Sequence, residues 1–330
     1  MRVTVTLLLL LCVPECFAQT SSPSPTVPPP PSPSPQTFVP PPYQQLRYEE
    51  DYEYLKDKSK RQEWLDRLKY IQLGKPGWYL SIGGEGRLRY ETYRNANFGS
   101  GTQDQNGYLL QRYLLHSDWH LGNKYRVFAQ LQVALITNRN GGPRPTDKDV
   151  FDIHQAFVDY KAFSTEKDSL TFRIGRQELD FGAGRLISAN DSPNIRRTFD
   201  GIRAIYKRGD WTVNSHFAKL VDARPGVFDD RPAHDETFWG GAAIRIRKKA
   251  RGGLALYYLG IDRKSARFDQ GSAREIRHTF GSRVWGVVKQ FDYNYEAIGQ
   301  TGSFGNGDIR AFAFGTDTGF NLRKVKFQPR

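Results

Sequence analysis

The sequence has 330 residues, with 48 Lys and Arg against 35 Asp and Glu, which gives a net charge of +13. The mean hydropathy of −0.62 and the lack of a second long apolar run exclude a bundle of membrane-spanning helices. A transmembrane sheet remains allowed, because only every second side chain of its strands faces lipid. Cys12 and Cys16 both lie at the N-terminus, so the chain after them offers no thiol for disulfides, metal ligation or catalysis.

Residues 1–18 are predicted to form an export signal. Arg2 supplies the positive start, Leu7 to Val13 the apolar region, and Cys16-Phe17-Ala18 a suitable cleavage site. The apolar run is too short for a transmembrane helix, which needs roughly 20 residues. An exported chain meets no nucleic acid, so the basic charge indicates acidic polymers, anionic solutes or lipid headgroups as partners.

Three regions follow the signal. Residues 19–42 are rich in Pro and Ser and are expected to form an extended linker. Residues 43–76 are expected to form a periplasmic N-terminal segment, partly helical, since Trp64, Leu65 and Leu68 recur at helical spacing. Residues 77–330 are expected to form the β-domain.

The β-domain shows apolar and polar side chains in alternation. In the first strand, Leu88 and Tyr90 alternate with Arg87 and Arg89, the period of two that is typical of a sheet with different surroundings on its two faces. About twelve strands are predicted, at roughly 78–91, 108–121, 125–133, 150–162, 169–177, 199–207, 211–221, 237–247, 253–261, 276–286, 288–300 and 308–318.

The predicted connections alternate between short and long. The short ones are 121–124, 163–168, 207–210 and 248–252, and the long ones are 94–107, 138–149, 180–197, 222–236 and 262–274. Short turns on one side and long loops on the other are typical of an all-β, antiparallel up-and-down outer-membrane barrel. A soluble sandwich has no physical reason to alternate in this way.

Charged and amide side chains on the polar faces are the main functional signal. Inside a closed barrel they would line a water-filled lumen with low-dielectric walls, where fixed positive charge attracts anions. The alternative for each arginine is a wall salt bridge with Glu85, Glu91, Asp118 or Asp200. The predicted pore-lining residues are Glu85, Arg87, Arg89, Arg112, Arg126, Gln130, Arg173, Arg176, Asp200, Arg203, Arg245, Arg247, Arg283 and Arg310.

No pattern of catalytic or metal-binding residues supports an enzyme. His116 and His120 are four residues apart, which on a strand is roughly 13 Å, too far to share an ion. Ser117 faces the opposite side from His116, so the two cannot act as nucleophile and base. We therefore expect neither catalysis nor a metal nor another cofactor.

Several motifs resemble the alginate export family of outer-membrane porins. They are Gly83-Gly84-Glu85, the central motif with 175–178, 182–186, Asn194, Arg196 and 199–201, and the stretch 278–286. The resemblance implies a monomeric barrel of about eighteen strands, with an electropositive lumen, that secretes alginate passively and without a cofactor.

The number of strands departs from that family. About twelve strands are predicted, and the chain ends at Gln328-Pro329-Arg330, without the terminal aromatic strand usual in such barrels. We expect either a truncated eighteen-stranded barrel or a genuine smaller barrel. In a smaller barrel the first and last strands would have to pair.

The sequence thus predicts a passive, anion-selective channel in the bacterial outer membrane that exports alginate or a similar anionic polysaccharide. The alternatives are a porin for small anionic or sugar solutes and a non-conducting structural or adhesin barrel. The expected partners are the transported solute, outer-membrane lipid and periplasmic secretion components, with no nucleic acid.

Overall fold

The computed structural model describes residues 38–247 and 251–322. The chain divides into residues 1–42 and 43–330. The predicted signal, the linker up to residue 37 and the predicted C-terminal turn lie outside the described residues. Residues 38–42 form neither helix nor strand.

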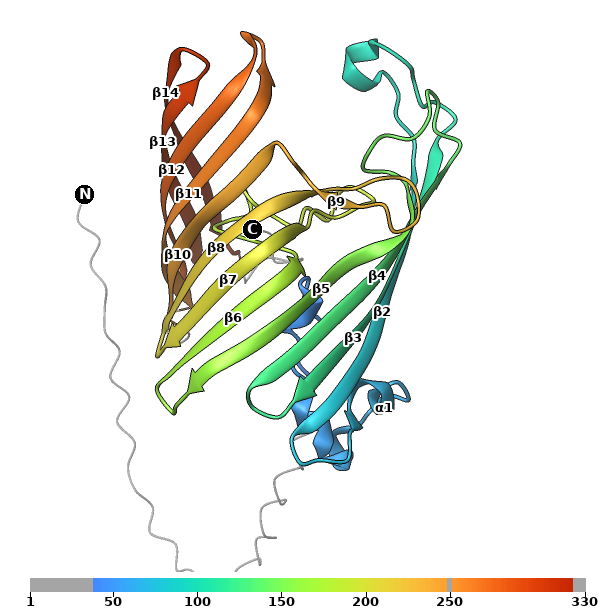
Figure 1. Cartoon of the computed structure of the whole chain (residues 1–330), viewed down its shortest axis with the longest axis vertical. Coiled ribbons are helices and arrows are strands. Elements are labelled where there is room, and N and C mark those ends of the chain that lie inside the picture. The colour runs from blue at the N-terminus through green and yellow to red at the C-terminus, as the bar shows by residue number, and fades with distance from the viewer. Residues whose placement is uncertain (1–37, 248–250, 323–330) are drawn as a thin grey trace, which may run out of the picture. The chain divides into compact units, whose positions relative to one another are not determined.

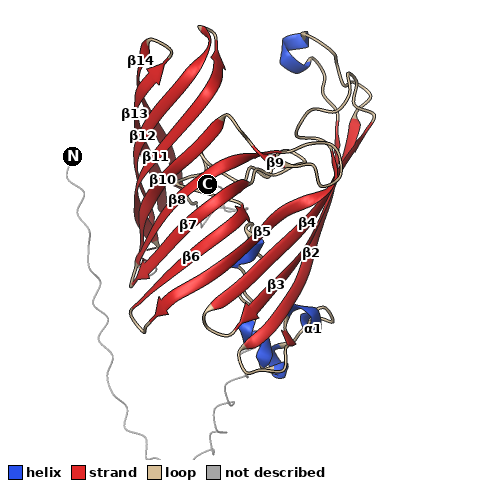
Figure 2. Cartoon of the chain, in the orientation of Figure 1, coloured by secondary structure: helices blue, strands red, loops and turns tan. Residues whose placement is uncertain are grey.

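Residues 43–247 and 251–322 contain one antiparallel sheet with twelve long strands and two strands of two residues (Figures 1 and 2). The strands are β1 (Ile71–Gln72), β2 (Trp78–Glu91), β3 (Tyr108–Leu121), β4 (Tyr125–Thr137), β5 (Asp149–Ser164), β6 (Asp168–Gln177), β7 (Phe199–Arg208), β8 (Trp211–Asp222), β9 (Arg231–Pro232), β10 (Glu236–Arg247), β11 (Gly252–Phe268), β12 (Gly271–Val288), β13 (Phe291–Phe304) and β14 (Gly307–Phe320).

Each long strand pairs with its neighbours in the sequence, and β9 pairs with β8 beside the main path. The predicted all-β, up-and-down antiparallel fold is therefore confirmed. The sheet is strongly curved (Figure 1). In the part of the chain that the structure describes, β2 and β14 do not pair with each other, so the sheet is open between them.

One long loop of the prediction does not exist. Residues 262–274 were expected to connect two strands, but β11 and β12 continue through them to a two-residue turn, with Phe268 opposite Gly271. Arg274 contributes to this pairing by donating to both carboxylate oxygens of Asp262, at 3.0 and 2.7 Å. The strands were not predicted here because charged side chains occur on both faces, so apolar and polar residues do not alternate. Backbone pairing does not require that alternation.

The N-terminal segment is a series of short turns rather than a longer helix. It contains η1 (Arg47–Glu49), η2 (Glu53–Lys56), η3 (Lys58–Lys60) and α1 (Asp66–Lys69), and η4 (Ala96–Gly99) lies in the β2–β3 loop. The Asp66 carboxylate accepts from the N–H groups of Gln62 and Glu63, which stabilises the turn that precedes α1. Among the described residues, no helix is both long and apolar enough to cross a membrane.

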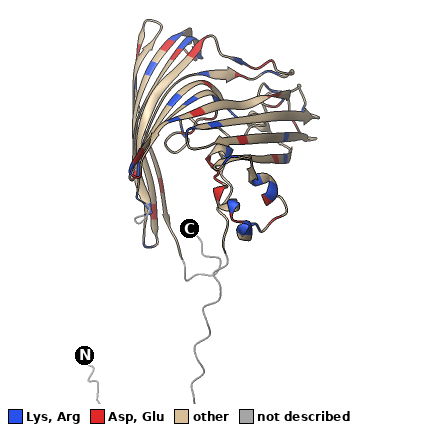
Figure 3. Ribbon diagram, turned by 60° about the horizontal axis from the view of Figure 1, so that its bottom comes forward, with Lys and Arg blue, Asp and Glu red and all other residues tan. Residues whose placement is uncertain are grey.

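The two faces of the sheet differ in chemistry. We call inner the face on which Tyr48 and the β6–β7 loop pack, and outer the opposite face. The outer face carries exposed large apolar side chains along most strands, among them Leu88, Leu115, Ile174, Ile202, Phe217, Leu256, Phe280, Phe312 and Phe314. Basic and acidic residues are interspersed along the same strands (Figure 3).

The buried apolar clusters lie between the inner face and the segments that pack on it. One joins Leu46 and Tyr48 to Phe128, Phe157 and Ala189. Another contains Leu179, Phe181 and Ile187 of the β6–β7 loop, packed on residues of β7, β8, β10 and β11. These clusters hold two irregular segments inside the curve of the sheet, next to the predicted pore-lining residues.

Candidate pore lining

The strand register divides the predicted pore-lining residues between the two faces. Glu85, for example, lies on β2 with the same parity as Arg87, and Arg87 is opposite Arg112 on β3. Nine of the predicted residues lie on the inner face: Glu85, Arg87, Arg89, Arg112, Arg126, Gln130, Arg173, Arg203 and Arg283.

The other five predicted residues lie on the outer face, which corrects their assignment to the polar one. Arg176 is opposite Asp200 in the same parity as Ile174 and Ile202. The remaining three are Arg245, Arg247 and Arg310. All five lie at or near strand ends. A polar side chain there can extend beyond the hydrocarbon layer from either face, so polarity no longer indicates the face.

Most arginines of the inner face are bound to carboxylates. Arg112 Nη2 lies 2.6 Å from Glu85 Oε1, and Arg89 Nε lies 2.6 Å from Glu91 Oε1. The other two pairs are Arg126 with Asp118 and Arg173 with Asp159, both at 2.7 Å. These four arginines therefore form wall salt bridges, which was the alternative interpretation of the sequence. A paired guanidinium contributes little net field, since the charge of its carboxylate cancels it at a distance.

The β6–β7 loop, residues 178–198, is held on the inner face by arginines; we call it the inner loop. Arg87 donates to the backbone carbonyls of Asp191 and Pro193, both at 2.6 Å. Arg112 Nη2 also lies 2.6 Å from Asp191 Oδ1. Asn194 donates to three backbone carbonyls, those of Gln111, Leu135 and Asp147. The first half of the sheet thus binds one end of the inner loop.

The second half of the sheet binds the other end of the inner loop. Arg185 Nη1 lies 2.5 Å from Glu296 Oε2 on β13. Arg283, on β12, donates to the carbonyl of Gly182 and, at 2.8 Å, to Asn294. The inner loop can reach both β3 and β13 only because the sheet curves around it.

Tyr48 fixes the N-terminal segment against the same face. Its ring lies 5.5 Å from that of Phe157, and the guanidinium of Arg173 lies 4.3 Å above it. The Tyr48 hydroxyl donates to the carbonyl of Glu178 at 2.9 Å, and the Tyr48 carbonyl accepts from Arg126 at 2.6 Å. The N-terminal segment and the inner loop therefore meet beside the arginines of β4 and β6.

Glu178, the first residue of the inner loop, is completely surrounded by polar partners. Its Oε1 lies 2.8 Å from His154 Nε2 and 2.9 Å from Arg196 Nε. All three side chains are at least 98% buried. A buried carboxylate with one cation and one imidazole is strongly constrained in position, so this contact determines where the inner loop leaves β6.

A cavity of about 710 Å³ lies between these inserted segments and the wall. It is bounded by Arg203, by Lys161 near the end of β5, by Lys207 near the end of β7, and by Lys124 in the β3–β4 turn. Acidic side chains, Glu49 and Asp51 among them, also border it. Arg203 donates to Asn214 Oδ1 at 3.0 Å and makes no ion pair with any described carboxylate.

The lysines were missed as candidates, although the sequence contained a signal for them. Lys161 has the parity of Asp159, and Lys207 has the parity of Arg203. Counting along those strands in steps of two from the predicted arginines would have found both.

The histidines of β3 lie on the inner face in aromatic contacts. The His120 ring stacks on Tyr79, with 4.2 Å between ring centres, and its Nε2 lies 3.1 Å from Asp118 Oδ2. His116 stacks on Phe128 at 5.5 Å. These contacts give both rings a packing role.

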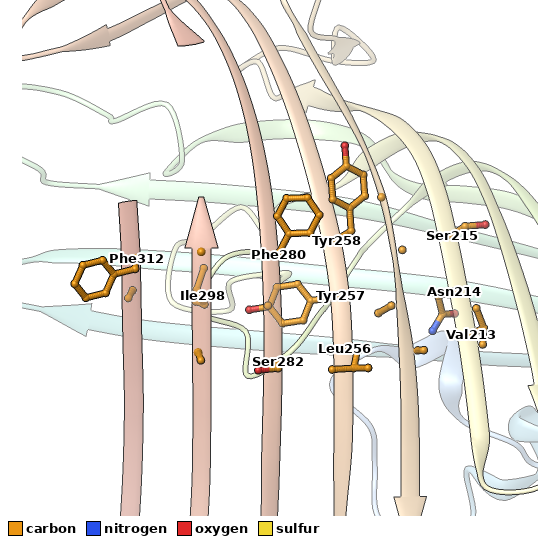
Figure 4. Close-up of a pocket in the computed structure, with 18 of the residues that line it drawn as sticks. Val213, Asn214, Ser215, Leu256, Tyr257, Tyr258, Phe280, Ser282, Ile298 and Phe312 are labelled. Carbon is orange, nitrogen blue, oxygen red and sulfur yellow. The ribbon is translucent and has the colours of Figure 1, made fainter. Parts of the chain in front are cut away.

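A second hollow, of about 930 Å³, lies over β8 and β10–β14 and has a different character (Figure 4). Its exposed lining is largely apolar, with Leu256, Phe280 and Phe312 around small residues such as Gly241 and Ala243. Leu256, Phe280 and Phe312 have outer-face parity. The hollow is therefore an irregularity of the apolar face, and its lining contains no cationic side chain.

An up-and-down antiparallel sheet with an apolar outer face and a charged inner face defines the channel-forming class of outer-membrane β-proteins. Residues 78–330 match the model of the family described as alginate export, and the chain belongs to that family. The predicted resemblance is thereby confirmed. The family is one of outer-membrane channels for a polysaccharide and is not a known class of enzymes. A comparison with curated proteins found no match.

Proposed function

We propose that this protein is a passive, anion-selective outer-membrane channel for alginate or a similar anionic polysaccharide. One observation carries the proposal: Arg203, on the inner face, borders a cavity with Lys124, Lys161 and Lys207, and none of these four cations makes an ion pair with a described residue. Their charge is thus available to a passing anion.

The physical basis is the field of fixed charges in a narrow aqueous space. Low-dielectric walls focus that field, so cations on the wall raise the local concentration of anions and repel other cations. A polyuronate carries one carboxylate per sugar. Arginine can bind a carboxylate through two hydrogen bonds. Lysine attracts a carboxylate as a flexible point charge. Several weak sites in sequence favour movement over tight binding.

The ion pairs of the inner face reduce the number of predicted pore-lining arginines whose charge is free. Arg112, Arg126 and Arg173 form ion pairs with carboxylates of the wall or the inner loop. In this proposal they position the inner loop and the N-terminal segment. Selectivity then depends on Arg203 and the lysines around the cavity.

The test is the reversal potential of the full chain in a planar bilayer under a KCl gradient. Arg203→Gln should shift the reversal potential towards cation selectivity. It should also weaken block by uronate oligomers by about fivefold, the value of one charge about 4 Å away in water. Arg208→Gln, at the end of β7 with outer-face parity, is the matched control and should change neither. An Arg203→Gln channel with wild-type selectivity and block would contradict the proposal.

A porin for small anions is the second candidate. The observation in its favour is that the inner loop and Tyr48 occupy part of the inner side, which leaves less room for a polymer than for a small solute. Conductance carried by small anions, together with no block by uronate oligomers of any length, would favour this candidate.

A further inference from the structure

Strand β5 contains two irregularities that change the direction of its side chains. Gln132 on β4 is opposite Asp152, but Ala134 is opposite Asp149 rather than residue 150. One extra residue is thus inserted into β5 between these two pairs, as in a β-bulge. Asp149 and Asp152 are three residues apart and would face opposite sides of a regular strand. The bulge places both opposite inner-face residues of β4.

A third carboxylate arrives from a distant part of the chain. Asp230 lies in the connection between β8 and β9, and its backbone N–H donates to Asp152 Oδ2 at 3.1 Å. Asp149, Asp152 and Asp230 each offer one carboxylate oxygen, and these oxygens lie within 4.8 Å of one another. The Asp149 and Asp152 residues are 0% and 3% exposed. The Asp230 side chain is 4% exposed.

Two oxygen atoms at this cluster are buried without a hydrogen-bond donor. They are Asp149 Oδ1 and the amide oxygen of Gln132, a side chain that is 1% exposed. Gln132 Nε2 donates to Asp149 Oδ2 at 2.5 Å, so the unpartnered amide oxygen belongs to a group already in contact with the cluster. Buried oxygens without a donor are unfavourable, and a bound cation would satisfy them.

The nearby arginine does not neutralise three carboxylates. Arg176 Nη1 lies 3.7 Å from Asp152 Oδ1 and 3.8 Å from Asp230 Oδ2, beyond hydrogen-bond distance. The same guanidinium binds both oxygens of Asp200, at 2.9 and 3.1 Å. Its single charge is thus shared with a fourth carboxylate. Asp229, the neighbour of Asp230, adds further negative charge nearby.

We propose that Asp149, Asp152 and Asp230 form a binding site for one calcium ion, with Gln132 as a fourth ligand once its amide turns to place the oxygen where Nε2 now contacts Asp149. All four ligands are oxygens, the donors that Ca²⁺ prefers, and water would complete its coordination of six to eight. Mg²⁺ requires a stricter octahedral geometry and gives up its water reluctantly, so an irregular group of buried oxygens favours Ca²⁺. The ion would connect β4 and β5 to the β8–β9 connection. The sequence predicted no metal, so this proposal departs from that expectation. The site also plays no part in the proposed transport function.

The experiment measures calcium binding directly. The full chain is refolded into detergent without lipopolysaccharide, which itself binds calcium, then treated with a chelator and dialysed against ⁴⁵Ca²⁺. Wild-type protein should bind one Ca²⁺ per chain saturably. Asp149→Asn, which keeps the size of the side chain, should lose at least about tenfold in affinity. Asp222→Asn is the control, because its exposed carboxylate pairs with Arg224 and with no other residue that the structure describes, and it should bind as the wild type does.

A second variant makes the test independent of the folding of the first. Gln132→Met keeps all three carboxylates and removes one neutral ligand, so it should weaken Ca²⁺ binding without abolishing it. Calcium should raise the melting temperature of the wild type and of Asp222→Asn, but not that of Asp149→Asn. Wild-type protein that binds no Ca²⁺ at millimolar concentration would overturn the proposal. Wild-type affinity in both Asp149→Asn and Gln132→Met would also overturn it.

Discussion

Arg185 Nη1 lies 2.5 Å from Glu296 Oε2, and this contact joins the inner loop to β13, 111 residues further along the chain. Glu296 is 2% exposed and also accepts from the Tyr257 hydroxyl at 2.8 Å. At the opposite end of the loop, Arg112 binds Asp191. The inner loop is thus fixed at two places on the curved sheet, which makes it a structural part of the inner face.

Glu296→Gln should therefore destabilise the fold. The change removes the charge that Arg185 binds. Because Arg185 is one-third exposed, we expect a loss of about 1–2 kcal/mol rather than the full value of a buried pair. Urea unfolding of the refolded protein in detergent measures it. Asp308→Asn removes an exposed ion pair with Arg310 and should leave the midpoint unchanged; equal midpoints for all three proteins would contradict the structural role of Glu296.

Tyr48→Ala should release the N-terminal segment from the inner face. The variant loses a buried aromatic ring, its edge-to-face contact with Phe157, its cation–π contact with Arg173 and the hydrogen bond to Glu178, at a cost of about 3–5 kcal/mol. Limited proteolysis should then cut within residues 43–70 faster than in the wild type, and single-channel conductance should rise. Trp64→Ala, which removes a side chain of an 82% exposed residue, should alter neither. Unchanged proteolysis of Tyr48→Ala would show that other contacts hold the segment.

Removing a complete ion pair should leave charge selectivity intact. In the double variant Asp159→Asn with Arg173→Gln, which removes both members of one ion pair, the net charge of the inner face stays the same, since one negative and one positive charge are lost together. Its reversal potential should match the wild type, whereas Arg203→Gln should differ. The wild-type preference for anions should also fall as salt rises from 0.1 M, where the screening length is about 10 Å, to 1 M, where it is about 3 Å. If the preference for anions did not change with salt concentration, selectivity would depend on steric fit rather than on charge.

Stability in calcium-free buffer should depend on Asp230. Burial, together with the charge of Asp152, raises the pKa of Asp230 to about 6. A carboxyl whose folded pKa is raised favours folding when protonated, so this stabilisation is complete below the unfolded pKa of about 4 and is lost as pH rises through 6. The free energy of unfolding should thus fall by about 1–2 kcal/mol between pH 4 and pH 8. Melting temperatures measured over that range should decline accordingly. Asp230→Asn should remove the part of the decline in melting temperature that Asp230 causes. A variant whose melting temperature depends on pH as in the wild type would contradict the role given to Asp230.

Much of the fold could be predicted because it follows from local alternation. Leu88 and Tyr90 face one side and Arg87 and Arg89 the other, and the backbone of a strand leaves no other choice once the strand exists. The same argument failed for Arg176, where the strand ends and polar side chains occur on both faces. It also failed at residues 262–274, where charged residues continue a hairpin beyond the apolar band.

The candidate site could be predicted only as a list of charges. Which arginines keep a free charge depends on the carboxylates that the fold brings near them, such as Asp191, which lies 79 residues after Arg112. A period of two places a side chain on a face but does not identify what packs against it. The sequence alone therefore determined the class of fold, the family and the polarity of each face, since these depend on neighbouring residues. The curvature of the sheet decided which wall residues bind the inner loop, and a bulge in β5 decided which carboxylates meet, because both bring together atoms that chain order leaves apart.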